Sequence, residues 1–306
     1  MIRRHGPTAA GASPVPPETV RVSAPAKVNL FLEVLGKRAD GYHEIATLIL
    51  AIDLEDELDV APAESGELSL TCDDPALPTG PENLVLKAAS RLRAETGTSA
   101  GARIHLRKRI PWAAGLGGGS SDAAAALEGL NELWKLGLST AALARVGSDI
   151  GSDVPFFLNG PAAWCTGRGE VVSPVAVGRQ LDLVLVKPPE GLSTADVYRR
   201  LVVPGTPVDG RAAREALASG DVEALGRALF NRLQEPAFVL SPAVAETGRR
   251  VQGVGAAGSL MTGSGSALFA LCRSPSEARR VHDDLSRGWA TGGEAPTRTF
   301  LVRSRP

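Results

Sequence analysis

The sequence has few cysteines, lysines and aromatic residues and contains no long hydrophobic run. Its three cysteines lie far apart and form no CxxC pair, which argues against a disulfide framework or a zinc site and favours reduced thiols. No stretch approaches the ~18 apolar residues of a membrane span, and the N-terminus lacks the apolar segment of a signal peptide. We therefore expect a cytoplasmic protein that has no membrane partner.

An excess of either charge is also absent. Lys and Arg number 33 against 34 for Asp and Glu, which gives a formal net charge of -1. Nucleic-acid-binding proteins usually carry a basic excess, so nucleic acid is not expected as a partner. A small anionic ligand needs only a few local donors and is compatible with this balance. Only 6 of the 33 basic residues are lysines, which makes Lys27 and Lys108 conspicuous.

The 306 residues give enough length for two modest domains. Residues 1–18, rich in Pro and Gly, are predicted to form a disordered leader. A new succession of strands and helices starts near residue 180. We therefore predict an N-terminal domain over 19–177 and a C-terminal domain over 178–306. Strands are expected both in runs and between helices, which is typical of an α+β fold.

Residue periodicity predicts the individual elements. Alternating and β-branched residues predict strands over 20–23, 28–34, 46–52, 56–60, 102–107, 183–186, 267–271 and 299–302. Apolar residues three and four apart predict helices over 82–95, 139–150, 192–201, 209–218, 221–233 and 275–287. A further amphipathic helix should begin with Ser120 or Ser121 as its N-cap and stop at Gly137.

A glycine-rich segment directly before that helix is the most unusual part of the sequence. It consists of Pro111, Trp112, Ala113, Ala114, Gly115, Leu116, Gly117, Gly118, Gly119, Ser120 and Ser121. Glycine allows backbone N–H groups to approach a ligand and to adopt positive φ, and a helix N-terminus favours anions. No Lys follows as in a Walker loop, and Ser120 stands where a dinucleotide fingerprint needs Gly. A hinge or tight turn is the alternative, but a phosphate site is favoured.

This glycine-rich segment resembles the phosphate-binding motif of the GHMP kinases, named for galacto-, homoserine, mevalonate and phosphomevalonate kinases. The family's other two motifs are matched, in order, by Ala24-Pro25-Ala26-Lys27-Val28-Asn29-Leu30 and by Thr262-Gly263-Ser264-Gly265-Ser266. The resemblance covers roughly residues 20–303. It implies a two-domain α+β fold, with an N-terminal domain like a ribosomal-protein fold and a C-terminal α+β sandwich. It also implies that ATP is a co-substrate.

Two further segments narrow the resemblance to one branch of the family. They are Arg38-Ala39-Asp40-Gly41-Tyr42-His43 and Gly151-Ser152-Asp153-Val154-Pro155-Phe156-Phe157. That branch phosphorylates the 2-hydroxyl of a methylerythritol carrying a cytidyl diphosphate group, in the non-mevalonate route to isoprenoid precursors. Mg²⁺ is expected with ATP, held mainly by phosphates and waters, and no protein metal ligand is assigned.

The resemblance assigns the catalytic roles to Lys27 and Asp153. Lys27 would stabilise charge on the transferred phosphate and keep Asp153 ionised, and Asp153 would accept the hydroxyl proton. Without the resemblance, Lys27 could be an edge-strand lysine that reaches solvent, and Asp153 could cap a turn. Asp149, four residues earlier, is the local rival for the base.

The same resemblance assigns the binding of the cytidyl substrate. His43 would hydrogen-bond cytosine, with Tyr42 in the same pocket and Tyr198 stacked on the base. Asn29, two residues after Lys27, should share its face of the strand and contact the reacting substrate. The remaining assigned positions, in the third motif, are Gly263 and Gly265.

Three alternative functions stay open from the sequence. The chain could be a homoserine- or mevalonate-type kinase of the same family, although the segment over 38–43 argues against it. It could be a nucleotide-binding regulator without catalysis, which would not need both Lys27 and Asp153. It could be an RNA-binding module, which the neutral charge disfavours. A monomer or weak homodimer is expected.

Overall fold

The computed structural model describes residues 18–64, 66–203, 205–289 and 297–306. The predicted leader over 1–18 therefore lies outside the described residues, except for residue 18. The chain forms two compact units, each assembled from three stretches. Unit 1 holds the described part of Met1–Ala26 with Leu54–Ile110 and Gly118–Asn159, and unit 2 holds Lys27–Asp53, Pro111–Gly117 and Gly160–Pro306. The predicted single division after residue 177 stays a prediction.

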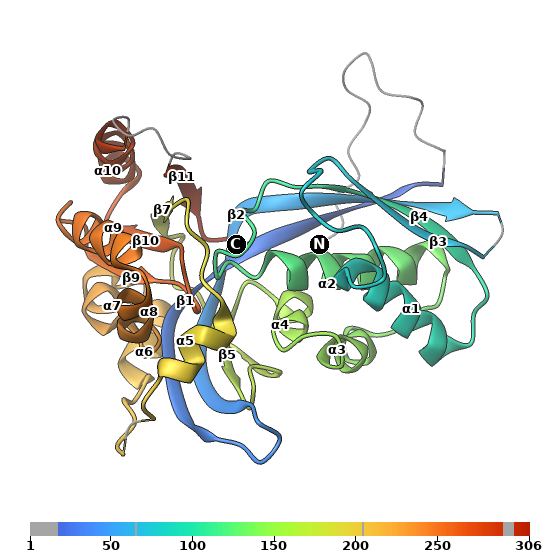
Figure 1. The fold of residues 1–306 in the computed structure, drawn as a ribbon, viewed down its shortest axis with the longest axis horizontal. Coiled ribbons are helices and arrows are strands. Elements are labelled where there is room, and N and C mark those ends of the chain that lie inside the picture. Colours follow the sequence, from blue (N-terminus) through green and yellow to red (C-terminus); the bar gives the residue numbers. More distant parts are fainter. Residues whose placement is uncertain (1–17, 65, 204, 290–296) are drawn as a thin grey trace. The chain divides into compact units, whose positions relative to one another are not determined.

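Unit 1 packs helices on an open sheet. Its strands are β3 (Leu68–Cys72), β4 (Gly101–Arg107), and the parts of β1 (Val20–Lys37) and β2 (His43–Ala63) that belong to this unit. β4 pairs antiparallel with β2 and parallel with β3. The helices are α1 (Leu84–Thr96), α2 (Gly118–Leu133), α3 (Thr140–Ser148) and α4 (Val154–Asn159), which lie together below these strands in Figure 1.

The core of unit 1 follows from the periodicity of these elements. Alternate residues of β4 are buried, as the sequence predicted, and Ile104 and Leu106 meet the apolar faces of the helices. The faces of α1 and α2 contribute Leu92 and Leu127, both fully buried. Asn83 accepts a hydrogen bond from the backbone N–H of Val85 and so begins α1.

Unit 2 contains a four-stranded antiparallel sheet in the order β11-β7-β10-β9. Its strands are β7 (Asp182–Lys187), β9 (Gly258–Met261), β10 (Leu268–Cys272) and β11 (Arg298–Arg303). Around it lie α5 (Thr194–Arg200), α6 (Arg211–Ser219), α7 (Val222–Ala228), α8 (Gln234–Leu240), α9 (Pro242–Gln252) and α10 (Pro275–Gly288). In addition, β5 (Ala162–Thr166) pairs with β2 and β6 (Val171–Pro174), and β8 (Phe230–Asn231) pairs with β1.

The mixed strands and helices confirm the predicted α+β class. Two local predictions are wrong. The helix expected over 221–233 ends at Ala228, because Leu229 is extended and Phe230 pairs with Phe31 of β1. Helix α2 begins at Gly118, so Ser120 and Ser121 lie inside its first turn instead of capping it. The sequence analysis also did not predict β3, β5, β6, β8, β9, α4, α8 or α9.

The structure also bears on membrane spans and disulfides. Among the described residues, no helix combines the length and apolar character needed to cross a bilayer. Cys72, Cys165 and Cys272, all of which the structure describes, form no disulfide.

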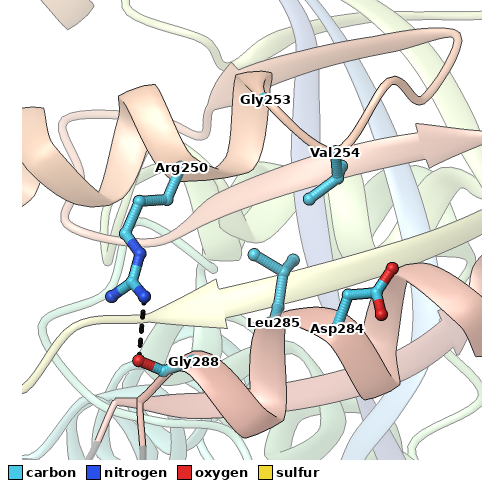
Figure 2. A pocket seen from close by; sticks show the side chains of 6 residues that line it. All are labelled: Arg250, Gly253, Val254, Asp284, Leu285 and Gly288. Carbon is cyan, nitrogen blue, oxygen red and sulfur yellow. Dashed lines mark hydrogen bonds between the residues drawn. The ribbon is translucent and has the colours of Figure 1, made fainter.

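A cavity of about 260 Å³ lies in unit 2 beside α9 and α10. Figure 2 shows Arg250 reaching from α9 toward the carbonyl of Gly288, to which it donates a hydrogen bond of 2.8 Å. Val254 and Leu285 supply its apolar lining, and Asp284 points toward solvent-exposed arginines. None of the lining residues is a predicted site residue, so the candidate site lies elsewhere.

Candidate active site

Lys27 is buried in β1, with only 4% of its surface exposed. Its ammonium donates a 2.6 Å hydrogen bond to Oδ1 of Asn29, which confirms that the two side chains share one face of the strand. A buried ammonium requires polar partners, because water no longer solvates it. Lys27 is therefore a positioned cation, and the alternative of a lysine that reaches solvent is excluded.

Asn29 is itself held from several sides. Its side-chain amide donates to Thr47 Oγ1 at 2.8 Å, and its backbone N–H donates to Thr262 Oγ1 at 2.9 Å. The hydroxyl of Thr47 in turn donates a hydrogen bond to the carbonyl of Phe31. These bonds fix which end of the Asn29 amide is the carbonyl oxygen, and that oxygen faces Lys27.

The turn over Thr262–Ser266 brings the third predicted motif to the same place. Gly263 has φ +57°, and a Cβ at this position would lie 3.3 Å from Lys27 Nζ. Glycine therefore leaves room beside the ammonium. Gly265, with φ +87°, forms the other tight corner of the turn, where a Cβ would lie 2.8 Å from Met261 Sδ.

Asn231 binds the turn over Thr262–Ser266, and the sequence analysis did not predict this role. Its buried amide donates to the carbonyls of Met261 and Gly263, at 2.7 and 2.8 Å. Asn231 lies in β8, which forms part of a region predicted as helix. Only its position between Phe230 and Arg232, at the end of an amphipathic pattern, could have drawn attention to it, and that signal is weak.

The first part of the glycine-rich segment, Pro111–Gly117, also meets these residues in unit 2. The backbone N–H of Lys27 donates to the carbonyl of Leu116 at 3.0 Å, and that of Ala267 donates to the carbonyl of Ala114 at 3.1 Å. Gly115 has φ +75°, and a Cβ there would lie 2.3 Å from the carbonyl oxygen of Thr262. The three motif segments thus meet around Lys27.

The second part of the segment begins α2 in unit 1. Gly117 has φ +70°, whereas Gly118 and Gly119 have none of the positive φ that the glycine run suggested. The N–H groups of a helix's first turn have no partner inside the helix, so they are available to an anion. Ser121 Oγ is buried here and has no hydrogen-bond partner among the described residues.

Asp153 is half-buried and immediately precedes α4, in unit 1. Its rival Asp149 is exposed at the C-terminal end of α3, where it accepts hydrogen bonds from Arg91 at 3.0 and 3.1 Å. Asp149 is therefore engaged in a surface ion pair. Lys27 belongs to the other unit, and its pairing with Asp153 stays a prediction.

Two carboxylates share a buried ammonium at the start of α2. Lys108 Nζ donates to Asp122 Oδ2 at 2.9 Å and also to Asp56 Oδ2. Burial raises the pKa of Asp122 to about 7, and the charge of Asp56 adds to this increase although Lys108 opposes it. Burial lowers the pKa of Lys108, but Asp122 and Asp56 outweigh it and leave that pKa raised.

Two of the three side chains expected to bind cytosine, those of His43 and Tyr198, are in contact in unit 2. The rings of His43 and Tyr198 are stacked, with their centroids 4.9 Å apart. Tyr42 is 55% exposed, and the guanidinium of Arg168 lies 5.0 Å from its ring centroid. Burial and the charge of Lys37 lower the pKa of His43, so its ring is neutral at pH 7 and offers one donor and one acceptor.

Comparison with known families agrees with this arrangement. The model of the "GHMP kinases N terminal domain" matches residues 83–161, and the model "GHMP kinases C terminal" matches residues 213–291. A homoserine kinase from Cytophaga hutchinsonii, 21% identical, has the same fold, with a TM-score of 0.75 over 97% of both chains. The chain is therefore a GHMP kinase, an ATP-dependent small-molecule kinase with the two-domain α+β fold of that family.

More similar relatives identify the branch. The 4-diphosphocytidyl-2-C-methyl-D-erythritol kinase of Pelotomaculum thermopropionicum is 46% identical, covering 84% of this chain and 91% of the relative. That of Kineococcus radiotolerans is 42% identical, covering 89% and 88%. A crystal structure of 4-(cytidine 5'-diphospho)-2C-methyl-D-erythritol kinase, 39% identical, has a TM-score of 0.77 over 93% of this chain and 99% of its own. The chain belongs to this family of kinases.

Proposed function

We propose that the protein transfers the γ-phosphoryl group of ATP to the 2-hydroxyl of 4-diphosphocytidyl-2-C-methyl-D-erythritol. The products are the 2-phosphate and ADP, in the non-mevalonate route to isoprenoid precursors. The observation that carries the proposal is the meeting of three motif segments around buried Lys27, in a chain 39–46% identical to kinases named for this substrate.

The glycine-rich segment would bind the phosphates of ATP. Gly115 and Gly117 turn the backbone through positive φ, and α2 then presents the unpaired N–H groups of its first turn. The N-terminal end of this 16-residue helix carries a partial positive charge. Backbone donors and the helix dipole together favour a polyphosphate, and no lysine of Walker type is required.

Mg²⁺ would accompany the nucleotide. The buried hydroxyl of Ser121, which has no hydrogen-bond partner among the described residues, is an oxygen ligand of the hard type that Mg²⁺ prefers. Among the described residues, no three His, Cys, Asp or Glu side chains are grouped as a metal cage. Phosphate oxygens and waters would therefore supply most ligands, and the ion would neutralise phosphate charge.

Asp153 and Lys27 would perform the transfer. Asp153 accepts the proton of the 2-hydroxyl as its oxygen forms a bond to the γ-phosphorus, while the bond from that phosphorus to the bridging oxygen of ADP breaks. Lys27 supplies a fixed positive charge to the phosphoryl oxygens. Asn29 and Thr262 hold that ammonium in position before the substrate binds, so no reorganisation is needed during the reaction.

Tyr42, His43 and Tyr198 would bind the cytosine end. Cytosine has a flat face for stacking and an edge with both donors and acceptors, which suit aromatic rings and a neutral imidazole. The 4.9 Å stack of His43 on Tyr198 supports the inclusion of Tyr198. Asn29, Gly263 and Gly265 are proposed to face the methylerythritol end beside Lys27.

A coupled assay of ADP release with three acceptors tests the proposal. The purified enzyme is given Mg²⁺–ATP with the cytidyl substrate, with mevalonate or with homoserine. We expect turnover with the cytidyl substrate alone, since the other two offer no base to Tyr42, His43 and Tyr198. Efficient phosphorylation of mevalonate would overturn the choice of substrate, and absence of turnover with all three would favour a non-catalytic nucleotide-binding protein.

The remaining expectations stay proposals of the same kind. Neutral overall charge supports a small-molecule partner instead of nucleic acid. Cysteines without a disulfide support a cytoplasmic location. A monomer or weak homodimer is proposed, and light scattering of the purified protein measures it.

A further inference from the structure

The buried ion cluster in unit 1 lies where the chain enters and leaves the glycine-rich segment. Lys108 directly follows β4, Asp56 belongs to β2, and Asp122 belongs to α2. Their side chains are 7%, 0% and 4% exposed, respectively. Three segments that are distant in sequence thus contribute one ionisable group each to a site that water does not solvate.

The entry to the glycine-rich segment is fixed by Asp56. Its Oδ1 accepts the backbone N–H groups of Arg109 and Ile110, at 2.5 and 2.9 Å. These two residues immediately precede Pro111. Since the other oxygen of Asp56 is bonded to Lys108, the carboxylate links the chain before the segment to the ammonium.

The exit from the segment is fixed by the same ammonium. Lys108 Nζ bonds Asp122 in α2, and it lies 3.4 Å from the place where a Cβ of Gly118 would be. Gly118 is the first residue of the helix. The ammonium therefore packs directly behind the helix end that presents the free N–H groups.

The energetics make a purely stabilising role a poor explanation. Burying charged groups is expensive, and apolar replacements of buried ion pairs are often neutral or stabilising. A buried hydrogen-bonded pair does fix geometry, because each bond restricts distance and direction. The cluster uses that property at both ends of one functional segment.

We propose that Lys108, Asp56 and Asp122 are positioning residues for ATP. They hold residues 109–110 and the first turn of α2 at a fixed spacing, so that the glycine-rich segment between them is preorganised for the phosphates. None of the three residues is among those proposed to contact the transferred phosphate or the cytidyl substrate. The inference rests on the proposed function, in that it takes the glycine-rich segment to bind ATP.

The test uses the full-length enzyme with the double variant Lys108→Met/Asp122→Asn, which removes the Lys108–Asp122 pair and leaves Asp56 bonded to the backbone N–H groups of Arg109 and Ile110. Asp59→Asn is the matched control. Asp59 also lies in β2 and is buried among Arg21 and Arg107, but it bonds no residue of the glycine-rich segment. Lys108→Arg keeps the charge and serves as the rescue.

For the double variant we expect KM for ATP to rise by about 10- to 100-fold, the scale of a misplaced binding group. KM for the cytidyl substrate should stay within about twofold. Lys108→Arg should recover most of the ATP affinity. Asp59→Asn should lower the melting temperature without changing KM for ATP. The proposal would be overturned if KM for ATP changed equally in the double variant and in Asp59→Asn. It would also be overturned if KM for ATP and KM for the cytidyl substrate rose equally in the double variant.

Calorimetric binding of Mg²⁺–ADP without any acceptor separates this inference from the proposed function. If wild-type enzyme binds ADP but phosphorylates no cytidyl substrate, the proposed function fails. The ADP affinities of the double variant and the control still test whether the network positions the nucleotide site. If the double variant precipitates, Asp122→Asn is measured against Asp59→Asn by the same criteria. Unchanged ADP affinity in a folded variant refutes the network.

Discussion

Replacing Gly115 by alanine should damage nucleotide binding through two separable effects. The first is backbone strain, because Gly115 has φ +75° and a left-handed conformation costs an L-residue about 1–2 kcal/mol. The second is a clash, because the new Cβ would lie 2.3 Å from the carbonyl oxygen of Thr262 and 3.2 Å from Gly265. Forced overpacking costs about 1–3 kcal/mol, so the two effects together reach about 2–5 kcal/mol.

Gly137→Ala is the control that isolates the first effect. Gly137 has φ +65°, and a Cβ there would meet nothing within 4 Å. It should therefore lose only the strain energy of about 1–2 kcal/mol. The difference between the two variants measures the contact of Gly115 with the turn over Thr262–Ser266.

Thermal unfolding and titration with Mg²⁺–ADP provide the two readouts. At roughly 2–4 °C per kcal/mol, Gly137→Ala should melt about 2–8 °C below wild type. Gly115→Ala should melt lower still, and of the two variants it alone should lose ADP affinity. If the two variants have the same melting temperature and both bind ADP normally, Gly115 does not approach Thr262 closely in the protein. The conclusion that the motif segments meet around Lys27 is then refuted.

Three further outcomes are expected. Asp153→Asn should lower turnover by about 10²–10⁴-fold while ATP binding persists, and near-normal turnover in the purified variant would remove it as the base. His43→Ala should weaken binding of the cytidyl substrate by about 5- to 150-fold with ATP affinity unchanged; equal losses for both ligands would mean that His43 supports the fold. Burial raises the pKa of Glu33, but hydrogen bonds from Arg232 and from backbone N–H groups outweigh it and leave that pKa lowered, so its contribution to stability is present above about pH 4.5 and is lost on further acidification. Glu33→Gln should flatten the acid limb of a plot of melting temperature against pH, and an unaltered limb would assign acid unfolding to other groups.

Local patterns in the sequence predicted the elements and the segments that carry the chemistry. The glycine-rich segment, the strand with Lys27 and Asn29, and the turn with Gly263 were recognisable because each is a continuous stretch with its own conformational demand. For the same reason the strand β4 and the helix α1 were predicted close to their observed bounds.

The partners that hold these segments could not be predicted, because they are distant in sequence and carry no pattern of their own. Asn29 meets Thr262, 233 residues away, and Lys108 meets Asp56, 52 residues away. The break in the helix expected over 221–233 has the same cause. Phe230 pairs with Phe31 in β1, and that pairing overrides the local preference for helix.

The long separations also have a consequence for the synthesis of the chain on the ribosome. Lys27, Asn29 and Glu33 emerge early, but Arg232 and Thr262 follow 199 residues after Glu33 and 233 after Asn29. At about 5–20 residues per second, the Thr262 codon is reached roughly 12–47 s after that of Asn29. During that interval strand β1 lacks Thr262, and until Arg232 is synthesised Glu33 lacks its ion-pair partner. Unit 2 can fold completely only when residues from its last stretch, which starts at Gly160, have been synthesised, whereas the last stretch of unit 1 ends at Asn159 and is available earlier.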